Sequence, residues 1–131
     1  MPGIDDGAKS TLESIDLIKG LQELGVKQFM PTPHVMQDFY PNTDVTIGNA
    51  YQNLLEALDS KTLSNITINP AAEYMLDDNF QKILDTQEIF TLKGNYLLIE
   101  MSYFQPPINL EEIIFKIKMK GYLPILAHPE R

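Results

Sequence analysis

The sequence contains no cysteine among its 131 residues. Disulfides and thiolate metal sites are therefore excluded, and any metal must be held by imidazole and carboxylate groups. No hydrophobic run approaches the roughly 20 residues that a membrane-spanning helix needs. Basic residues are also scarce, with 10 against 18 acidic ones, and the net charge of −8 argues against a nucleic-acid-binding surface.

Apolar residues are plentiful enough for one folded domain, since 44% of the chain is hydrophobic. The acidic residues are dispersed and do not form a tail. No basic segment followed by an apolar stretch opens the chain, so secretion is not indicated. We expect a single cytoplasmic domain over residues 1–131.

Apolar periodicity and turn residues predict alternating helices and strands. We expect helices at residues 10–24, 44–58, 77–84 and 110–120, and strands at residues 27–32, 65–72, 96–100 and 123–127. Continuous apolar strands between helices are typical of a parallel sheet covered by helices, either an open doubly wound sheet or a (β/α) barrel.

Capping residues mark the predicted helix ends. Ser10 and Glu13 form a capping box at the first helix, which Gly25 closes, and Asn109 with Glu112 repeats the box before residue 110. Six apolar residues of the first helix recur with helical period and are expected to form its apolar face: Leu12, Ile15, Leu17, Ile18, Leu21 and Leu24. Val45 is expected on the inner face of the second helix.

The predicted order begins with a helix and ends with a strand, which leaves the sheet incomplete. Residues 1–7 have the character of a loop that follows a strand, and Arg131 falls where another βα unit would begin. The sequence therefore predicts an internal fragment of a longer domain, truncated at both ends.

Four potential metal ligands lie at the predicted C-terminal ends of strands. His34 follows the first strand, Glu73 ends the second, Glu100 ends the third and His128 follows the fourth. Active sites of parallel α/β barrels form on that face. Two imidazoles with two carboxylates suit zinc, manganese or iron(II).

Each of these residues also has a structural interpretation. A single histidine after a strand is more often an ordinary loop residue, whereas Glu100, after four apolar strand residues, is costly to bury unless it is paired or bound to metal. Asp5 and Asp6 form either a surface turn or a ligand-bearing loop. Arg131 is either a solvated charge, which Glu130 could pair with, or a guanidinium that holds phosphate.

Five segments resemble, in order and spacing, successive motifs of the metal-dependent protein-tyrosine phosphatases of the PHP (polymerase and histidinol phosphatase) family found in bacterial capsular and exopolysaccharide operons. They are Pro2-Gly3-Ile4-Asp5-Asp6-Gly7, Thr32-Pro33-His34, Ala72-Glu73-Tyr74, Leu98-Ile99-Glu100-Met101 and Ala127-His128-Pro129-Glu130-Arg131. The resemblance covers the whole chain and implies a partial (β/α) barrel of the TIM-like PHP type.

The resemblance also implies a cluster of three divalent metal ions, with manganese preferred and iron or zinc as alternatives. Glu73 would bridge two metals, and Glu100 and His128 would complete one of those two sites. Asp6 with His34 would contribute to the third site. Asp5 is the less favoured of the two loop aspartates as a ligand.

Arg131 matches the arginine that holds the substrate phosphate in this family, and His128 and Arg131 are the expected catalytic residues. Two family motifs, His-x-His before residue 1 and Asp-x-His after residue 131, are not in the sequence. We therefore expect poor activity from this chain alone, unless a partner chain or a swapped copy supplies the missing strands.

The expected reaction is metal-assisted hydrolysis of a phosphotyrosine, in which metal ions bind the phosphate and lower the pKa of the attacking water. The absence of cysteine excludes a thiolate nucleophile. The resemblance implies a bacterial tyrosine kinase as protein partner. The alternatives are another PHP phosphoesterase, such as a histidinol-phosphate phosphatase or a nuclease-like phosphodiesterase, and a non-catalytic α/β interaction domain.

Overall fold

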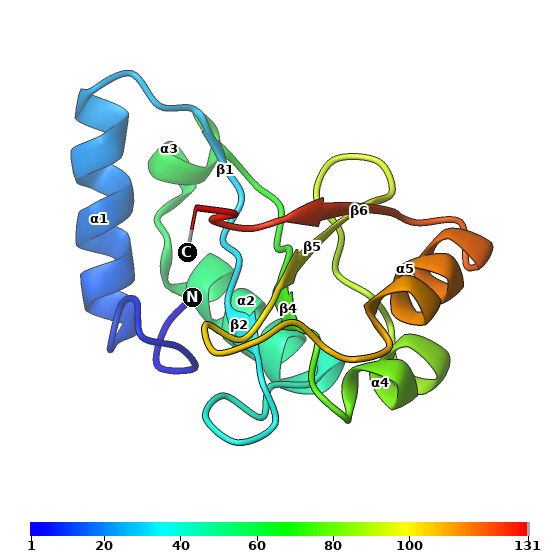
Figure 1. Cartoon of the computed structure of the whole chain (residues 1–131). Helices are drawn as coiled ribbons and strands as arrows, with labels where there is room; N and C mark the ends of the chain where they lie inside the picture. The colour runs from blue at the N-terminus through cyan, green and yellow to red at the C-terminus, as the bar shows by residue number, and fades with distance from the viewer. Residues whose placement is uncertain (131) are drawn as a thin grey trace.

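A computed structural model describes residues 1–130 as an α/β fold (Figure 1). In chain order the elements are α1 (Thr11–Glu23), β1 (Gln28–Phe29), β2 (His34–Val35), α2 (Asp44–Ala57), α3 (Ser60–Leu63), β3 (Thr67–Ile68), β4 (Glu73–Met75), α4 (Phe80–Thr86), β5 (Tyr96–Glu100), α5 (Leu110–Met119) and β6 (Leu123–Leu126). In the described part of the chain, no helix has the length and apolar character needed to cross a bilayer.

All strand pairings between these elements are parallel, as the sequence predicts. Four strands form one sheet in the order β2-β4-β5-β6, and β1 pairs with β3. His34 lies opposite Glu73, which lies opposite Leu98, which lies opposite Ile125. The described strands form an open sheet, so the parallel α/β architecture is confirmed, and the barrel is not closed by these residues.

The predicted strand at residues 27–32 is wrong in its extent, because only Gln28–Phe29 forms β1 and the next strand, β2, begins at His34. Backbone hydrogen bonds nevertheless bridge the gap. The Ala71 N–H donates to the Pro31 carbonyl, and the Glu73 N–H donates to the Pro33 carbonyl. Neither proline has an N–H to donate in return. One extended segment therefore runs from β1 into β2. At the two prolines it accepts hydrogen bonds from the neighbouring segment but donates none.

The predicted strand at residues 65–72 is also wrong in its extent, because the structure has two short strands in and after this region. Only Thr67–Ile68 forms β3, and Pro70 separates it from β4. Glu73, expected at the end of this strand, is instead the first residue of β4. His34 is similarly the first residue of β2 and not a loop residue after a strand.

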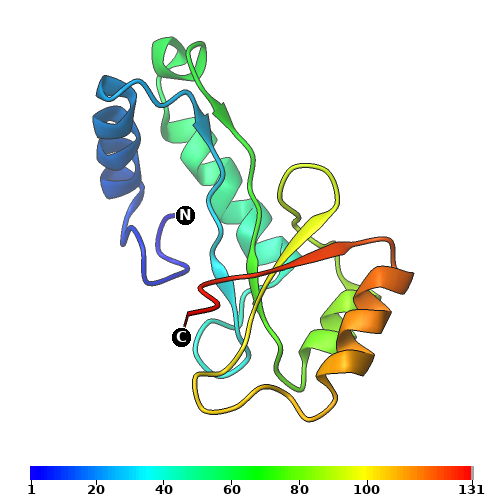
Figure 2. The ribbon, with the colours of Figure 1, turned by 45° about the horizontal axis from the view of Figure 1, so that its top comes forward.

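The main core lies between the central strands and the helices α2, α4 and α5. Leu97 and Ile99 of β5, Phe80 of α4 and Ile117 of α5 are almost fully buried. Each such side chain contributes about 1.5–3 kcal/mol relative to exposure. This packing fixes the end of β5, where Glu100 lies. Figure 2 shows α4 and α5 side by side, away from α1.

The predicted start and end of α1 are confirmed, but its predicted apolar face is only partly correct, since Ile18 is buried and Ile15 packs beside it while three leucines are exposed. The Ser10 hydroxyl accepts the Glu13 N–H, and Gly25 has a left-handed φ of 88° after the last turn. The Glu13 carboxylate bonds the Lys9 N–H and not that of Ser10. Leu12, Leu17 and Leu24 are 75%, 55% and 82% exposed, because α1 lies at the margin of the fold and packs along only one side, against α2.

The start of α4 and the capping of α5 also differ from the prediction, although α5 begins at residue 110 as expected. The aspartates at residues 77–78 precede α4, which begins at Phe80, and the Asp77 carboxylate instead accepts the N–H groups of Gln37 and Asn79. Asn109 precedes α5 without a side-chain capping bond. Val45, expected on an inner face, is 63% exposed in the first turn of α2. By contrast, β5 has the predicted limits.

Tyr74 anchors the loop before β5 to the core, which leads to a stability prediction. Its buried hydroxyl accepts the Phe90 N–H at 2.9 Å, and burial raises the pKa of Tyr74 to about 12. Tyr74→Phe would leave that N–H without its acceptor. We expect the free energy of unfolding to fall by about 1–3 kcal/mol in urea titrations.

Tyr96→Phe is the matched control, because Tyr96 is 45% exposed on β5. Its effect should stay within about 0.5 kcal/mol. Equal losses in the two variants would show that the bond to Phe90 contributes nothing specific.

Candidate metal centre

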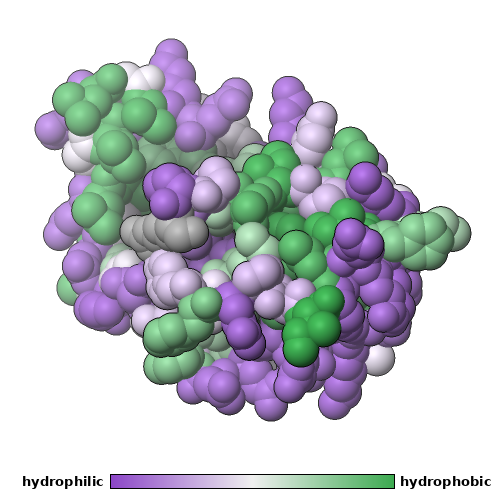
Figure 3. Space-filling view, in the orientation of Figure 1, coloured by the Kyte–Doolittle hydropathy of each residue, from purple (hydrophilic) through white to green (hydrophobic). Residues whose placement is uncertain are grey.

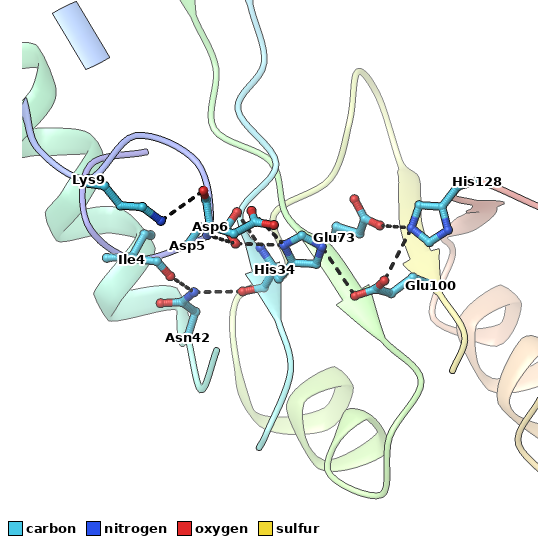
Figure 4. A network of polar contacts seen from close by, with 9 residues as sticks. All are labelled: Ile4, Asp5, Asp6, Lys9, His34, Asn42, Glu73, Glu100 and His128. Carbon is cyan, nitrogen blue, oxygen red and sulfur yellow. Dashed lines mark hydrogen bonds and ion pairs between the residues drawn. The ribbon is translucent and has the colours of Figure 1, made fainter. Parts of the chain in front are cut away.

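The side chains of His34, Glu73, Glu100 and His128 meet at one edge of the sheet (Figure 4). β2 and β4 place His34 and Glu73 opposite each other, and β5 ends at Glu100. His128 follows the end of β6 by two residues. Four residues that are far apart in the sequence are therefore brought together by neighbouring parallel strands.

Short contacts join these four side chains. His128 Nε2 lies 3.0 Å from Glu73 Oε1 and 3.5 Å from Glu100 Oε2. His34 Nε2 lies 3.8 Å from Glu100 Oε1. The two glutamates thus lie between two imidazoles, with His34 on one side and His128 on the other.

Glu100 is the most constrained member of the cluster. Its side chain is only 4% exposed, and Oε1 has no hydrogen-bond partner within the described part of the chain. Burial raises the pKa of Glu100; the charge of His34 acts against this and that of Glu73 adds to it, so the pKa lies above its ordinary value. A buried carboxylate oxygen without a partner is costly, and a bound cation would supply the missing interaction.

The donor atoms satisfy a distance test for metal binding. One donor atom from each of His34, Glu73 and Glu100 lies within 4.8 Å of the others, and the same holds for Asp5, Asp6 and His34. Nitrogen and oxygen donors of this kind suit zinc, manganese and iron(II). His34, Glu73 and Glu100 therefore fit a divalent metal, whereas His128, which the resemblance assigns to the same site, belongs to neither group of donors.

Asp5 and Asp6 have different environments. Asp5 is 11% exposed and bonds His34 twice, at Nδ1 (2.8 Å) and at the backbone N–H (3.2 Å). Asp6 is 65% exposed, with Oδ1 3.8 Å from His34 Nδ1. Asp5 thereby orients the imidazole so that Nε2 faces Glu100, which is the usual arrangement behind a metal-binding histidine.

The contact between Asp5 and His34 changes both ionisations. Burial by itself raises the pKa of Asp5, but the hydrogen bonds from His34 and from the Asp6 N–H outweigh it and lower the pKa. Burial by itself lowers the pKa of His34, but the hydrogen bond to Asp5 and the charges of Asp5 and Glu100 outweigh it and raise the pKa. The pair is therefore most strongly bound when Asp5 is ionised and His34 is protonated.

His128 has an unusual backbone conformation. Its φ is 29°, and it is the one non-glycine residue among residues 1–130 with a positive φ. Such a conformation costs of order 1–3 kcal/mol, and residues in such conformations cluster at functional sites. Here it accompanies the contacts of the imidazole with Glu73 and Glu100.

Three surrounding residues were not recognised from the sequence. Tyr40 stacks on His34, with ring centroids 5.5 Å apart, and Tyr103 stacks on His128 at 6.3 Å. Asn42 donates to the carbonyls of both Ile4 and His34 and so links the aspartate loop to β2. None belongs to a motif with a known spacing, and the sequence carries no signal for them. The predicted phosphate-binding Arg131 lies outside the described residues.

Comparisons with known proteins cover nearly the whole chain. Residues 1–131 match the family described as "Capsular polysaccharide synthesis, CpsB/CapC". Tyrosine-protein phosphatase YwqE of Bacillus subtilis is 26% identical over 100% of this chain and 52% of its own length. The putative tyrosine-protein phosphatase CapC of Staphylococcus aureus is 30% identical over 98% of this chain and 50% of its own. The chain thus spans about half the length of these relatives.

Tyrosine-protein phosphatase CpsB of Streptococcus pneumoniae is 29% identical over 98% of this chain and 53% of its own length. A solved structure described as "Crystal structures of YwqE from Bacillus subtilis and CpsB from Streptococcus pneumoniae, unique metal-dependent tyrosine phosphatases" superposes with a TM-score of 0.82 at 27% identity. It covers 98% of this chain and 52% of the other. The fold is therefore shared with a metal-dependent enzyme.

The contact between Asp5 and His34 predicts a pH dependence for the stability of the metal-free protein. The contribution of Asp5 is present above its unfolded pKa and is lost as the pH falls through the lowered folded value. The contribution of His34 is present below its unfolded pKa and is lost as the pH rises through the raised folded value. The stability lost in Asp5→Asn should therefore be largest between about pH 4 and pH 6.5 and smaller on both sides.

Urea unfolding at a series of pH values measures this difference. Asp16→Asn on the exposed side of α1 is the control and should show no such maximum. A loss in Asp5→Asn that stayed constant from pH 3 to pH 9 would contradict the assignment.

Proposed function

The chain belongs to the capsular polysaccharide synthesis CpsB/CapC family, and on that premise we propose that it takes part in the metal-dependent hydrolysis of phosphotyrosine in proteins. The observation that carries the proposal is the buried Glu100 carboxylate. It lies between two histidines beside Glu73, and one of its oxygens has no hydrogen-bond partner among residues 1–130. The relatives named as tyrosine phosphatases support the same activity.

Glu73, Glu100 and His128 are the proposed ligands of one metal position, and Glu73 is proposed to be shared with a second. Asp6 with His34 is proposed, from the family motifs alone, to contribute to a third. Manganese is the proposed metal, with iron or zinc as alternatives that the same nitrogen and oxygen donors also accept. When bound, such cations supply positive charge for the phosphate oxygens and lower the pKa of a bound water.

The protein side chains have distinct proposed tasks. Glu100 provides negative charge from a buried position, where electrostatic interactions are strong. Asp5 holds His34 with Nε2 directed into the cluster, and the strained backbone at His128 directs its imidazole at Glu73. Arg131 is proposed, from its sequence motif alone, to hold the phosphate group.

The proposed substrate is a phosphotyrosine protein, and a bacterial tyrosine kinase of the polysaccharide export system is the proposed partner. A cytoplasmic location is proposed with it. A phenolate, with a parent pKa near about 10, leaves more readily than an alkoxide, so hydrolysis requires less protonation of the leaving group. This suits a site whose described residues include two histidines but no cysteine nucleophile.

Glu100→Gln should have opposite effects on metal binding and on stability. Because the pKa of Glu100 is raised, the folded protein loses stability as this carboxyl ionises, and the neutral amide removes that loss. We expect the metal-free variant to unfold at higher urea concentration at pH 7. Its manganese affinity should fall by about 100-fold or more, and the slow manganese-dependent release of phosphate from a phosphotyrosine peptide should disappear.

Isothermal titration with manganese and a phosphate-release assay measure these effects. Glu111→Gln, an exposed glutamate in the first turn of α5, is the control and should behave like the parent chain. Equal manganese binding by the two variants would place the metal elsewhere. A parent chain that binds manganese but releases no phosphate above the metal-free rate would contradict the phosphatase activity of this chain.

A further inference from the structure

The loop between β5 and α5 presents two large aromatic side chains to solvent beside the cluster. Tyr103 is 65% exposed and Phe104 is 96% exposed. Scattered exposed apolar residues are common, but neighbouring aromatic rings at the edge of a polar site are a frequent feature of ligand-binding surfaces. Figure 3 shows hydrophobic side chains among hydrophilic ones over the face where this loop lies.

Tyr103 connects this loop to the cluster. Its ring stacks on the His128 ring with centroids 6.3 Å apart and an interplanar angle of 24°. This spacing is within the favourable range for aromatic pairs, about 4.5–7 Å. The same imidazole contacts Glu73 through Nε2 at 3.0 Å. A flat group placed against Tyr103 would therefore lie next to the proposed metal ligands.

A hollow of about 160 Å³ lies between this loop and the segment that follows β6. Its walls include Tyr103, Phe104, Pro106, His128 and Pro129. An apolar cavity of about 150 Å³ is sufficient to hold a benzene molecule. Both the size and the flat rings of the walls therefore suit a single aromatic ring.

We propose that this hollow, the aryl subsite, receives the phenyl ring of phosphotyrosine and that Tyr103 and Phe104 determine the preference for aryl over alkyl phosphate esters. The inference rests on the proposed function, because it requires that the phosphate is held at the adjacent cluster. The ring of an aryl ester is attached directly to the ester oxygen, so a bound phosphate brings the ring to the wall beside His128. An alkyl ester has no flat face to stack there.

Binding of non-hydrolysable phosphonates to the manganese-loaded full chain tests the aryl subsite. Benzylphosphonate carries a ring at the spacing of phenyl phosphate, and ethylphosphonate carries none. We expect the parent chain to bind benzylphosphonate roughly tenfold more tightly than ethylphosphonate. The double variant Tyr103→Ala with Phe104→Ala should lose this preference, while its ethylphosphonate affinity and manganese stoichiometry stay unchanged.

Two further variants separate the ring from other effects. Tyr103→Phe keeps the ring and should keep the preference. Phe39→Ala removes another exposed phenylalanine, 75% exposed and one residue before the Tyr40 that stacks on His34, and should leave both affinities unchanged.

The possible failures are distinguishable. Equal affinity of the parent chain for both phosphonates, or an equal loss of both in the double variant, would overturn the aryl subsite and leave the phosphate site intact. If neither phosphonate binds the manganese-loaded chain, the proposed function fails and the aryl subsite fails with it.

Discussion

Burial of the Glu100 carboxylate is the constraint on which the rest of the site depends. β5 passes through the centre of the core, and its last residue retains almost no exposure to solvent. Among the residues that the structure describes, one of its oxygens has no hydrogen-bond partner, and burial raises the pKa of Glu100. A fold selected for stability alone would place an apolar residue there. The cost becomes understandable if a divalent cation completes the site.

The neighbouring strands place the other groups through backbone geometry. Pro31 and Pro33 have no N–H to donate, so at these positions only their carbonyls bond the neighbouring segment. The chain nevertheless stays extended into β2. His34 and Glu73 therefore lie opposite each other, beside β5. Asp5 then fixes the imidazole from outside the sheet. Backbone pairing, the two prolines and one partly buried hydrogen bond together position the donors.

The sequence predicted this site better than it predicted the elements that carry it. The prediction of β5 is correct because a short apolar run that ends in a charged residue is typical of a buried strand. The family motifs identify His34, Glu73, Glu100 and His128, which the structure brings together. Extended segments with prolines were not divided correctly, because their pairing depends on partners about 40 residues away. The exposure of leucines on α1, and the stacking of a tyrosine ring on each histidine, depend on tertiary packing, which local sequence patterns do not encode.

The central claim is that a divalent cation completes the interactions of Glu100. Anomalous diffraction from crystals of the chain grown with manganese, recorded above and below the manganese absorption edge, tests it directly. We predict an anomalous peak in contact with carboxylate oxygens of both Glu73 and Glu100 and with His128. A well-ordered crystal in which this cluster shows no anomalous peak, or in which manganese occupies only exposed surface carboxylates, would contradict the account.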